Sequence, residues 1–351
     1  MLFDTWRRAI CCGCAFLGVS VLLMSLEPQP TTANEPVRLI FDTDLGDDID
    51  DAMALATIHA LQSRGECELL AVTIAKDNEL SGPAADAINT FYGRPDIPIG
   101  VVKNGKRPQE SRFTPSLVNT KNGEQQRYPH TLQSGKDAPE ATELLREILA
   151  KQPDHSVVFA QVGYSTNLAR LLDSKPDKHS PLSGRDLVAQ KVKLLSMMAG
   201  NFGAAQNKPE FNIVQDLESA KKVINDWPTP VVISGFEIGL NIPYPWQSVE
   251  NDFGYVADHP IREAYLAWDK KPHERPTWDL TSVLYAIRPD HGYFGLSDPG
   301  TATVDERKLT QFEFDPDGKH RYLTVTPEQI IRVKEALVQL TSQPPDQMPI
   351  Q

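Results

Sequence analysis

The sequence predicts an α/β protein with a mostly parallel open sheet that carries helices on both faces. Apolar runs of strand length alternate with segments of helical periodicity along most of the chain. The strand-like runs are apolar throughout, as expected for strands that are buried on both faces. Polar loops follow these runs, and in parallel sheets such loops meet at the carboxyl ends of the strands. Ligands bind at that edge, so we expect the active site there.

These patterns place the elements in order along the chain. Strands are predicted at residues 37–41, 67–75, 96–102, 156–163, 191–200 and 229–239. Helices are predicted at residues 50–63, 82–93, 138–151, 166–174, 216–227 and 326–342, the last one capped by Thr326. The polar, weakly periodic segment 101–137 should form a long loop or lid. The loops expected to converge on one rim of the sheet are residues 42–51, 162–167, 198–203 and 234–239.

The composition is that of an ordinary globular enzyme. Of the 351 residues, 40% are hydrophobic and 23% are charged. The formal net charge of −12 argues against a nucleic acid or an anionic membrane as partner, because neither would find a basic surface here. The prolines gather in connecting segments such as 28–36 and 243–245, which indicates a loop-rich domain.

The N-terminus differs from the rest of the chain. Arg7 and Arg8 precede an apolar stretch at residues 9–26, which is followed by the polar, proline-rich segment 27–36. This order is typical of a secretory signal peptide, here residues 1–33, so export to the periplasm or the extracellular space is expected. An N-terminal helix that stays uncleaved and anchors the protein is the alternative.

The segment after this leader is predicted to hold a single domain, residues 34–342, and a flexible tail, residues 343–351. Cys67 is the only cysteine that remains once the leader is removed. The domain therefore has no internal disulfide and no thiolate metal cluster. Its stability must come from packing, with or without a metal bound by oxygen atoms.

An acidic cluster directly follows the first predicted strand. Six aspartates stand within ten positions, namely Asp42, Asp44, Asp47, Asp48, Asp50 and Asp51. Such neighbours repel one another unless a cation neutralises them, and a hard dication such as Ca²⁺ prefers oxygen ligands. The segment does not fit a helix–loop–helix calcium loop, because Gly46 and Met53 occupy positions that need oxygen ligands there.

Two other interpretations of the acidic cluster remain open. Phosphatases with an aspartyl nucleophile also begin with a strand and D-x-D, which would make Asp42 the nucleophile and Asp44 the acid. That interpretation assigns no functional role to Asp50 and Asp51. In the other interpretation part of the cluster is structural, because Asp48 caps the following helix and Asp47 is solvated.

The motif D-T-D-L-G at 42–46, with D-D-A opening a helix at 50–52, resembles the inosine–uridine-preferring nucleoside hydrolase family. The family's usual spacing is D-x-D-P-G-x-D-D, whereas this chain has Leu45 in place of the proline and two extra residues before Asp50. Three further segments resemble family motifs: GYSTN at 163–167, GNFGAAQNKPEFN at 200–212 and TWDLTSVLYAI at 277–287. Together the four motifs cover most of residues 37–290 in the expected order.

The resemblance implies a set of site residues, carried over motif by motif. Ca²⁺ would be held by the carboxylates of Asp44, Asp51 and Asp279 and by the backbone carbonyl of Thr166. Asp42 would lie behind these ligands and orient the loop. The ribose contacts would come from Asp50, Asn78, Asn201, Glu210 and Asn212.

The resemblance also implies hydrolysis of an N-glycosidic bond in a ribonucleoside or a related glycoside. A metal-bound water would attack the anomeric carbon with Asp44 as general base, and the configuration at that carbon would invert. Carboxylates and amide oxygens of the rim would stabilise the oxocarbenium-like sugar. The implied partner is a small purine or pyrimidine nucleoside, and family members often form homo-oligomers.

One motif departs from the family in a way that affects departure of the base. Purine-cleaving members have a histidine before the metal-binding aspartate as leaving-group acid, whereas this chain has Trp278. Indole can stack on a base, so Trp278 is predicted to contact the substrate, but it cannot deliver a proton near neutral pH. Either His130, His273 or Tyr128 supplies the proton, or the leaving group needs none.

The other aromatic residues near this motif have two interpretations. Trp268, Tyr265 and Tyr285 could line an aromatic base site together with Trp278, although residues at such helical spacings more often belong to the core. A rival for the whole protein is a catalytically weakened or inactive sugar-binding protein that Ca²⁺ stabilises. An assay separates the two, because only the enzyme loses turnover when Asp44 becomes asparagine.

Overall fold

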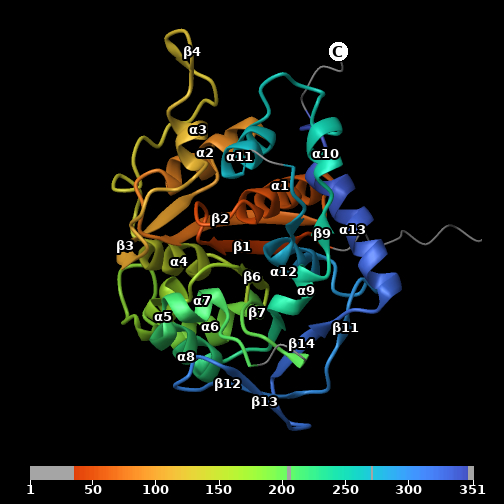
Figure 1. Ribbon diagram of the computed structural model, residues 1–351. Helices are drawn as coiled ribbons and strands as arrows, with labels where there is room; N and C mark the ends of the chain where they lie inside the picture. The colour runs from red at the N-terminus through yellow and green to blue at the C-terminus, as the bar shows by residue number, and fades with distance from the viewer. Residues whose placement is uncertain (1–34, 204–206, 270–271, 347–351) are drawn as a thin grey trace, which may run out of the picture. The chain divides into compact units, whose positions relative to one another are not determined.

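The computed structural model describes residues 35–203, 207–269 and 272–346. Its strands are β1 (Val37–Thr43), β2 (Cys67–Lys76), β3 (Ile99–Lys106), β4 (Lys121–Asn122), β5 (Gln125–Gln126), β6 (Val157–Gln161), β7 (Val192–Met198), β8 (Val231–Ser234), β9 (Pro243–Tyr244), β10 (Arg275–Pro276), β11 (Gly295–Leu296), β12 (Gly300–Val304), β13 (Thr310–Phe314) and β14 (His320–Thr324). The main sheet has the order β13-β12-β14-β8-β7-β6-β1-β2-β3 (Figure 1). The strands from β14 to β3 pair in parallel, and β12 pairs antiparallel with β13 and β14. The predicted fold class is confirmed.

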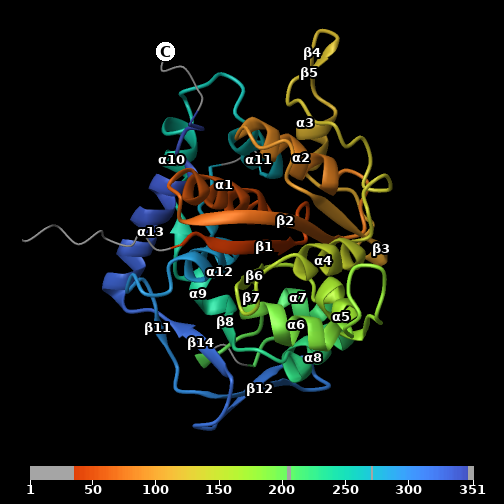
Figure 2. The ribbon, with the colours of Figure 1, turned by 180° about the vertical axis from the view of Figure 1, so that it is seen from behind.

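The helices lie in two layers, one on each face of this sheet. Their bounds are α1 (Asp50–Ser63), α2 (Ser81–Phe91), α3 (Thr114–Val118), α4 (Ala141–Ala150), α5 (Thr166–Asp173), α6 (Gly184–Lys191), α7 (Phe211–Gln215), α8 (Leu217–Asp226), α9 (Phe236–Leu240), α10 (Trp246–Asn251), α11 (Pro260–Trp268), α12 (Trp278–Ile287) and α13 (Pro327–Thr341). Helices α1, α2, α12 and α13 pack in one layer and α4, α5, α6 and α8 in the other. Figure 1 and the reverse view in Figure 2 show α1 and α2 on the opposite side of the strands from α4, α5, α6 and α8.

Strand β1 shows why helices must cover both faces of the sheet. Leu39 and Phe41 belong to the core on the α1 side, whereas Ile40 between them belongs to the core on the α4 side. Successive side chains of a strand point to opposite faces of the sheet, so an unbroken apolar run must be buried on both faces. The carboxyl end of β1 is thereby fixed between two packed layers, directly before Asp44.

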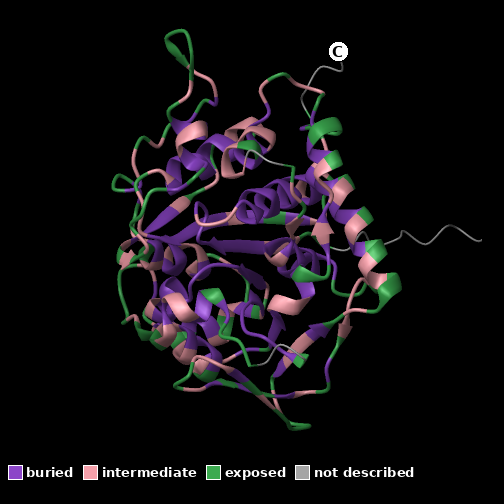
Figure 3. Ribbon diagram, in the orientation of Figure 1, coloured by how far each residue is buried: buried purple, intermediate pink, exposed green. Residues whose placement is uncertain are grey.

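Helix α1 follows the acidic loop and is buried along most of its length. Every residue from Asp50 to Leu61 is buried, and Figure 3 shows α1 buried along most of its length beside the central strands. A helix that is apolar nearly all round belongs inside a domain. Its first turn carries Asp50 and Asp51, so the fold takes two carboxylates out of water.

Three sequence-based placements need correction or completion. The strand predicted at 229–239 ends at Ser234, because the chain turns at Gly235 and forms α9. The strands β12, β13 and β14, which form the antiparallel end of the sheet, were not predicted. The segment 101–137 is mostly irregular, as predicted, but it contains the end of β3, helix α3 and the small β4–β5 hairpin. The closing helix α13 begins after Thr326, whose side chain forms a capping box with Gln329 as expected.

No helix in the part of the chain that the structure describes is long and apolar enough to span a membrane. The predicted signal peptide, residues 1–33, lies outside the described residues, and so does the end of the predicted tail after residue 346. Export therefore stays a prediction.

Candidate functional site

A pocket of about 400 Å³ opens at the carboxyl ends of four adjacent strands. Asp44 follows β1, Val162 follows β6, Met198 ends β7, and Phe236 follows β8 by one turn residue. All four line the pocket. The prediction that four loops converge on one rim is confirmed, and the pocket lies where parallel sheets bind ligands.

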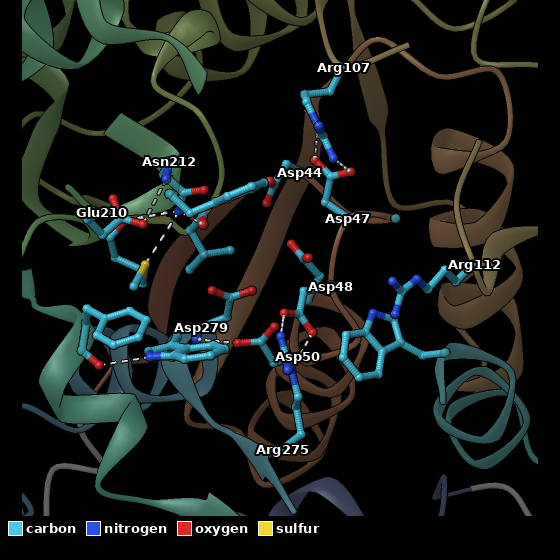
Figure 4. Close-up of a pocket in the computed structure, with 18 of the residues that line it drawn as sticks. Asp44, Asp47, Asp48, Asp50, Arg107, Arg112, Glu210, Asn212, Arg275 and Asp279 are labelled. Atoms are coloured by element: carbon cyan, nitrogen blue, oxygen red, sulfur yellow. Dashed lines mark hydrogen bonds and ion pairs between the residues drawn. The ribbon is translucent and has the colours of Figure 1, made fainter. Parts of the chain in front are cut away.

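Three carboxylates form the centre of this pocket. Each of Asp50, Asp51 and Asp279 offers an oxygen atom, and these atoms lie within 4.8 Å of one another. Asp50 and Asp51 belong to the first turn of α1 and Asp279 to the first turn of α12, where helix dipoles favour negative charge. Figure 4 shows Asp50 and Asp279 close together, with the Asp279 backbone N–H donating to Asp50 Oδ2 at 3.3 Å.

Their environment does not favour the charged form unless a cation is supplied. Burial raises the pKa of Asp50, Asp51 and Asp279 well above the usual range, and repulsion between neighbouring carboxylates raises it further. Thr43 Oγ1 donates to Asp51 Oδ1, while Asp51 Oδ2 is buried without a hydrogen-bond partner among the described residues. Three clustered carboxylates with an unsatisfied buried oxygen fit a hard divalent cation such as Ca²⁺ or Mg²⁺.

Asp44 lines the same pocket but lies outside the group of three. Burial raises its pKa well above the usual range, and the nearby Asp47 carboxylate raises it further. Asp42 lies behind, where Oδ2 accepts hydrogen bonds from Thr73 at 2.6 Å and Asn167 at 2.8 Å. Burial outweighs these two donors and raises the pKa of Asp42 to about 7. Asp42 is not a lining residue, and the resemblance implied a position behind the metal ligands for it.

The remaining two aspartates of the cluster are paired with protein cations. Asp47 accepts from the buried Lys76 Nζ at 2.6 Å. It also accepts from Arg107 Nε at 3.2 Å (Figure 4). The prediction that Asp47 is solvated is therefore wrong. Asp48 forms a two-point ion pair with Arg275, 227 positions away. The expectation that Asp48 caps α1 is wrong, because the N-cap residue is Ile49 and no side chain accepts a capping hydrogen bond there.

The loop after β6 places a different residue at the pocket from the one that the motif implied. Thr166 is not among the lining residues, and its hydroxyl donates to Asp216 Oδ2 at 2.5 Å. Val162 does line the pocket, and its carbonyl oxygen accepts from Asn212 Nδ2 at 2.7 Å. A backbone carbonyl leaves no trace in residue identity, so the sequence could not distinguish the two positions.

Glu210 and Asn212, both predicted ribose contacts, line the pocket opposite the three carboxylates (Figure 4). Glu210 caps α7 and accepts from the backbone N–H groups of Asn212 and Ile213 at 2.8 and 3.2 Å. Burial nevertheless raises the pKa of Glu210 to about 7. The amide nitrogen of Asn212 is held by Val162, which leaves its amide oxygen without a donor among the described residues.

Of the five predicted ribose contacts, Asp50 also lines the pocket, whereas Asn78 and Asn201 do not. Asn78 donates to the carbonyls of Pro108 and Gln109 at 3.3 and 3.1 Å, and so supports the loop that carries Arg107. Asn201 is buried and donates to the carbonyl of Lys208 at 3.2 Å. Both therefore stand next to lining segments instead of in the pocket wall.

Two of the four aromatic candidates line the pocket. Trp268 and Trp278 are lining residues, whereas Tyr265 and Tyr285 belong to the buried core. Trp278 Nε1 donates to the carbonyl of Phe236 at 2.8 Å, and the two rings stack with centroids 5.1 Å apart. The indole N–H is thus already used inside the protein.

None of the three predicted proton donors lines this pocket. Tyr128 donates to Glu263 at 2.7 Å, His130 contacts Gln126, and the ring of His273 stacks on Tyr265. The pocket contains charged residues that the sequence did not single out, namely Arg107, Glu110, Arg112 and Arg275. The only signal for them was the predicted lid, which carries the first three.

Comparison with known proteins identifies the family of the chain. The family model described as "Inosine-uridine preferring nucleoside hydrolase" matches residues 39–332. The chain belongs to this nucleoside hydrolase family. Among curated relatives, the pyrimidine-specific ribonucleoside hydrolase RihA of Citrobacter koseri is 29% identical over 210 residues, and that of Salmonella schwarzengrund is 30% identical over 210 residues. Each match covers 57% of this chain and 60% of the relative, so the chain spans about three fifths of the relatives' length.

Solved structures of nucleoside hydrolases share the fold of this family member. An inosine–guanosine nucleoside hydrolase aligns with a TM-score of 0.66 at 20% identity, covering 87% of this chain and 98% of that one. The inosine–uridine preferring nucleoside hydrolase of Bacillus anthracis aligns with a TM-score of 0.64 at 18% identity, covering 87% and 99%. The type III effector protein XopQ, solved with adenosine diphosphate ribose, aligns with a TM-score of 0.60 at 16% identity, covering 89% and 96%.

Proposed function

We propose that this protein hydrolyses the N-glycosidic bond of ribonucleosides and that its activity depends on a bound Ca²⁺ ion. The observation that carries the proposal is the group of Asp50, Asp51 and Asp279, buried at the strand ends with their oxygens within 4.8 Å. Membership of the nucleoside hydrolase family supports the reaction type. Two curated relatives carry ribonucleoside hydrolase in their names, which supports the substrate class.

The cation would be held by these three carboxylates, with Asp44 and the carbonyl oxygen of Val162 as further oxygen ligands from the same rim. This assignment replaces the carbonyl of Thr166, which is not a lining residue. When bound, such an ion neutralises the carboxylates, binds sugar hydroxyls and lowers the pKa of water beside it.

The residues of the chain supply the remaining steps. Asp44 takes a proton from the water that attacks the anomeric carbon, which requires its carboxylate to be charged. Attack from the side opposite the base inverts the configuration at that carbon. The C–N bond breaks as the sugar becomes oxocarbenium-like, and the ring of carboxylates stabilises this positive charge. Glu210 and the amide oxygen of Asn212 face the same space and accept hydrogen bonds from the ribose hydroxyls.

Asp44→Asn tests the proposal. With uridine as substrate and Ca²⁺ supplied, kcat should fall by about 10²–10⁴-fold, the range of general base catalysis. Asp317→Asn removes an exposed carboxylate in the turn between β13 and β14 and should leave kcat unchanged. Release of free ribose measures both. Absence of ribose release by the wild-type protein from any nucleoside would contradict the proposal.

A second function is favoured by one observation. The N–H of Trp278 is engaged by Phe236, and none of the predicted proton donors lines the pocket. A protein of this fold that binds ribose or another sugar without turnover fits that observation. In that case ribose binding, measured by calorimetry, persists in wild-type protein that releases no base, and Asp44→Asn leaves the binding unchanged.

We also propose that the protein is exported by its N-terminal segment, whose order of charge, apolar stretch and polar spacer supports this. N-terminal sequencing of the protein recovered from outside the cytoplasm should start near residue 34. A chain that keeps residue 1 and sediments with membranes would instead support the uncleaved anchor.

A further inference from the structure

One wall of the pocket is a continuous stack of aromatic rings and guanidinium groups. Phe236 stacks on Trp278, and the Arg275 guanidinium lies over the Trp278 ring at 5.0 Å. The same guanidinium lies over the Trp268 ring at 4.1 Å, and Arg112 contacts that ring at 5.3 Å. Arg275 therefore lies within about 5 Å of the centres of two indole rings. In the pocket it lies beside Asp50 (Figure 4).

The side chain of Arg275 is fixed but not fully used. Its Nε and Nη2 atoms donate to the two carboxylate oxygens of Asp48, the first at 2.8 Å. Nη1 has no hydrogen-bond partner among the described residues, and this atom is not fully buried. Arg275 lines the pocket, so these free N–H groups are available to a bound ligand. A planar guanidinium held by a two-point pair and two rings is pre-organised as a donor.

The chemistry of the leaving base calls for such a donor. When the C–N bond breaks, both bonding electrons stay on the base nitrogen, and the base departs as an anion unless a proton arrives. Purine-type departure is helped by an acid that protonates the ring, whereas a pyrimidinedione delocalises the charge onto the carbonyl next to the glycosidic nitrogen. An arginine cannot act as an acid here, but it can donate hydrogen bonds to that oxygen and stabilise the anion.

We propose that Arg275 is the catalytic residue that stabilises the departing base, and that the site is accordingly built for pyrimidine nucleosides with a carbonyl beside the glycosidic nitrogen. This inference rests on the proposed function. The electron balance is complete: water adds to the anomeric carbon, its proton goes to Asp44, the base leaves with the bonding pair next to Arg275, and it later takes a proton from solvent. Trp268 and Trp278 hold the cation in place through their ring faces.

Two substrates with different leaving groups separate this role from a structural one. Uridine has a poor leaving group that needs stabilisation, whereas p-nitrophenyl β-ribofuranoside has a good leaving group that needs none. In Arg275→Met, kcat/KM for uridine should fall by about 10²–10³-fold, and kcat/KM for the p-nitrophenyl substrate by less than about tenfold. Arg275→Lys should lose nearly as much on uridine, because lysine keeps the charge but not the planar fork.

The variants need controls for folding. Arg275→Met leaves Asp48 without its partner, so the double variant Asp48→Asn with Arg275→Met removes both charges and should show the same selective loss. Arg288→Met is the matched control. Arg288 follows the other end of α12 and forms an equivalent two-point pair with Glu66, at 2.6 Å for each hydrogen bond. It should leave the kcat/KM ratio of the two substrates unchanged.

The outcomes distinguish the possibilities. A selective loss on uridine, together with higher wild-type kcat/KM for uridine than for adenosine, supports the inference. An equal loss on both riboside substrates, no loss on either, or a preference for adenosine overturns it while leaving N-glycosidic hydrolysis intact. Wild-type protein that cleaves the p-nitrophenyl substrate but no nucleoside also overturns it. Absence of turnover of every substrate would instead overturn the proposed function and this inference together.

Discussion

The acidic loop after β1 has two halves that the structure treats differently. In one half, Asp47 and Asp48 are neutralised by cations of the protein itself, namely Lys76, Arg107 and Arg275. In the other half, Asp50 and Asp51 join Asp279 from α12 in a buried group that no cationic side chain of the described residues pairs with. The same residue type, two to four positions apart, has different electrostatic surroundings.

This difference shows how to recognise a carboxylate that is kept for a ligand. A paired aspartate stabilises the fold through a short hydrogen bond and needs nothing from outside. An unpaired buried aspartate is unfavourable in the protein alone, because burial and repulsion raise its pKa. A fold that retains three of them at strand ends is stabilised when a cation binds, so binding and stability are linked there.

The largest expected effect comes from breaking the unpaired half. Asp51→Asn or Asp279→Asn keeps side-chain volume but removes one charge from the three-carboxylate group. Affinity for Ca²⁺ should fall by about a hundredfold or more, since residues that only orient metal ligands already contribute about 10- to 100-fold. Ribose release from uridine should fall to background. Titration calorimetry and the activity assay measure the two, and full activity in either variant would contradict the assignment.

Breaking the paired half should instead affect stability. Asp47→Asn leaves Lys76, whose side chain is 1% exposed, without its carboxylate partner. Removing one partner of a buried ion pair destabilises a protein by about 3–5 kcal/mol. Urea unfolding should show this loss with Ca²⁺ affinity within a few-fold of wild type. If Asp47→Asn abolished Ca²⁺ binding while stability was kept, the division into two halves would be wrong.

The pH dependence of stability sharpens the comparison. Burial raises the pKa of Asp42 and Glu210 to about 7 and that of Asp51 well above its usual range. Between about pH 4 and pH 7 these carboxyl groups lose their protons in the unfolded chain but keep them in the folded, cation-free protein. The free energy of unfolding of the cation-free protein therefore falls as the pH rises through this range. Bound Ca²⁺ removes the part of this penalty that belongs to its own ligands, such as Asp51, and only where these carboxylates are ionised.

The stabilisation by Ca²⁺ should therefore grow with pH. At a free ion concentration about a hundredfold above the dissociation constant, it should reach about 2.7 kcal/mol near pH 8 and much less near pH 5. Thermal unfolding with Ca²⁺ and with a chelator, at both pH values, measures the difference. Equal stabilisation at the two pH values would show that Asp50, Asp51 and Asp279 are not the ligands.

The smallest effect is expected for the exposed partner of Asp47. Arg107 has a side chain that is 34% exposed, and Lys76 still neutralises Asp47 when Arg107 is removed. Arg107→Met should destabilise the protein by less than about 1 kcal/mol in urea unfolding. A loss as large as that of Asp47→Asn would show that Arg107, not Lys76, is the important partner.

The sequence was sufficient for the parts of the fold that depend on local pattern. Apolar runs identified β1, β2, β6 and β7, and the polar residues after them identified the rim that forms the pocket. Asp279 could be joined to Asp51 only through the motif resemblance, because 228 positions separate them in the chain. The antiparallel edge of β12, β13 and β14 was missed, since its strands are short and half exposed.

The sequence was insufficient where a role depends on long-range pairing or on the backbone. The pairs of Asp48 with Arg275 and Asp47 with Arg107 join distant segments, and no spacing rule predicts them. For the same reason Asp47 was expected to be solvated. The carbonyl of Val162 could not be told from that of Thr166, because a carbonyl oxygen has no residue type. Trp278 lines the pocket, and its hydrogen bond to Phe236 could be seen only in the structure.

Calorimetric titration of chelator-treated protein with Ca²⁺ at about pH 8 tests the central claim most directly. The wild-type protein should bind a single ion per chain, Asp47→Asn should bind it with similar affinity, and the double variant Asp51→Asn with Asp279→Asn should show no binding. If the wild-type protein bound no divalent ion, or the double variant bound Ca²⁺ as tightly as wild type, the unpaired carboxylates would not be a metal site.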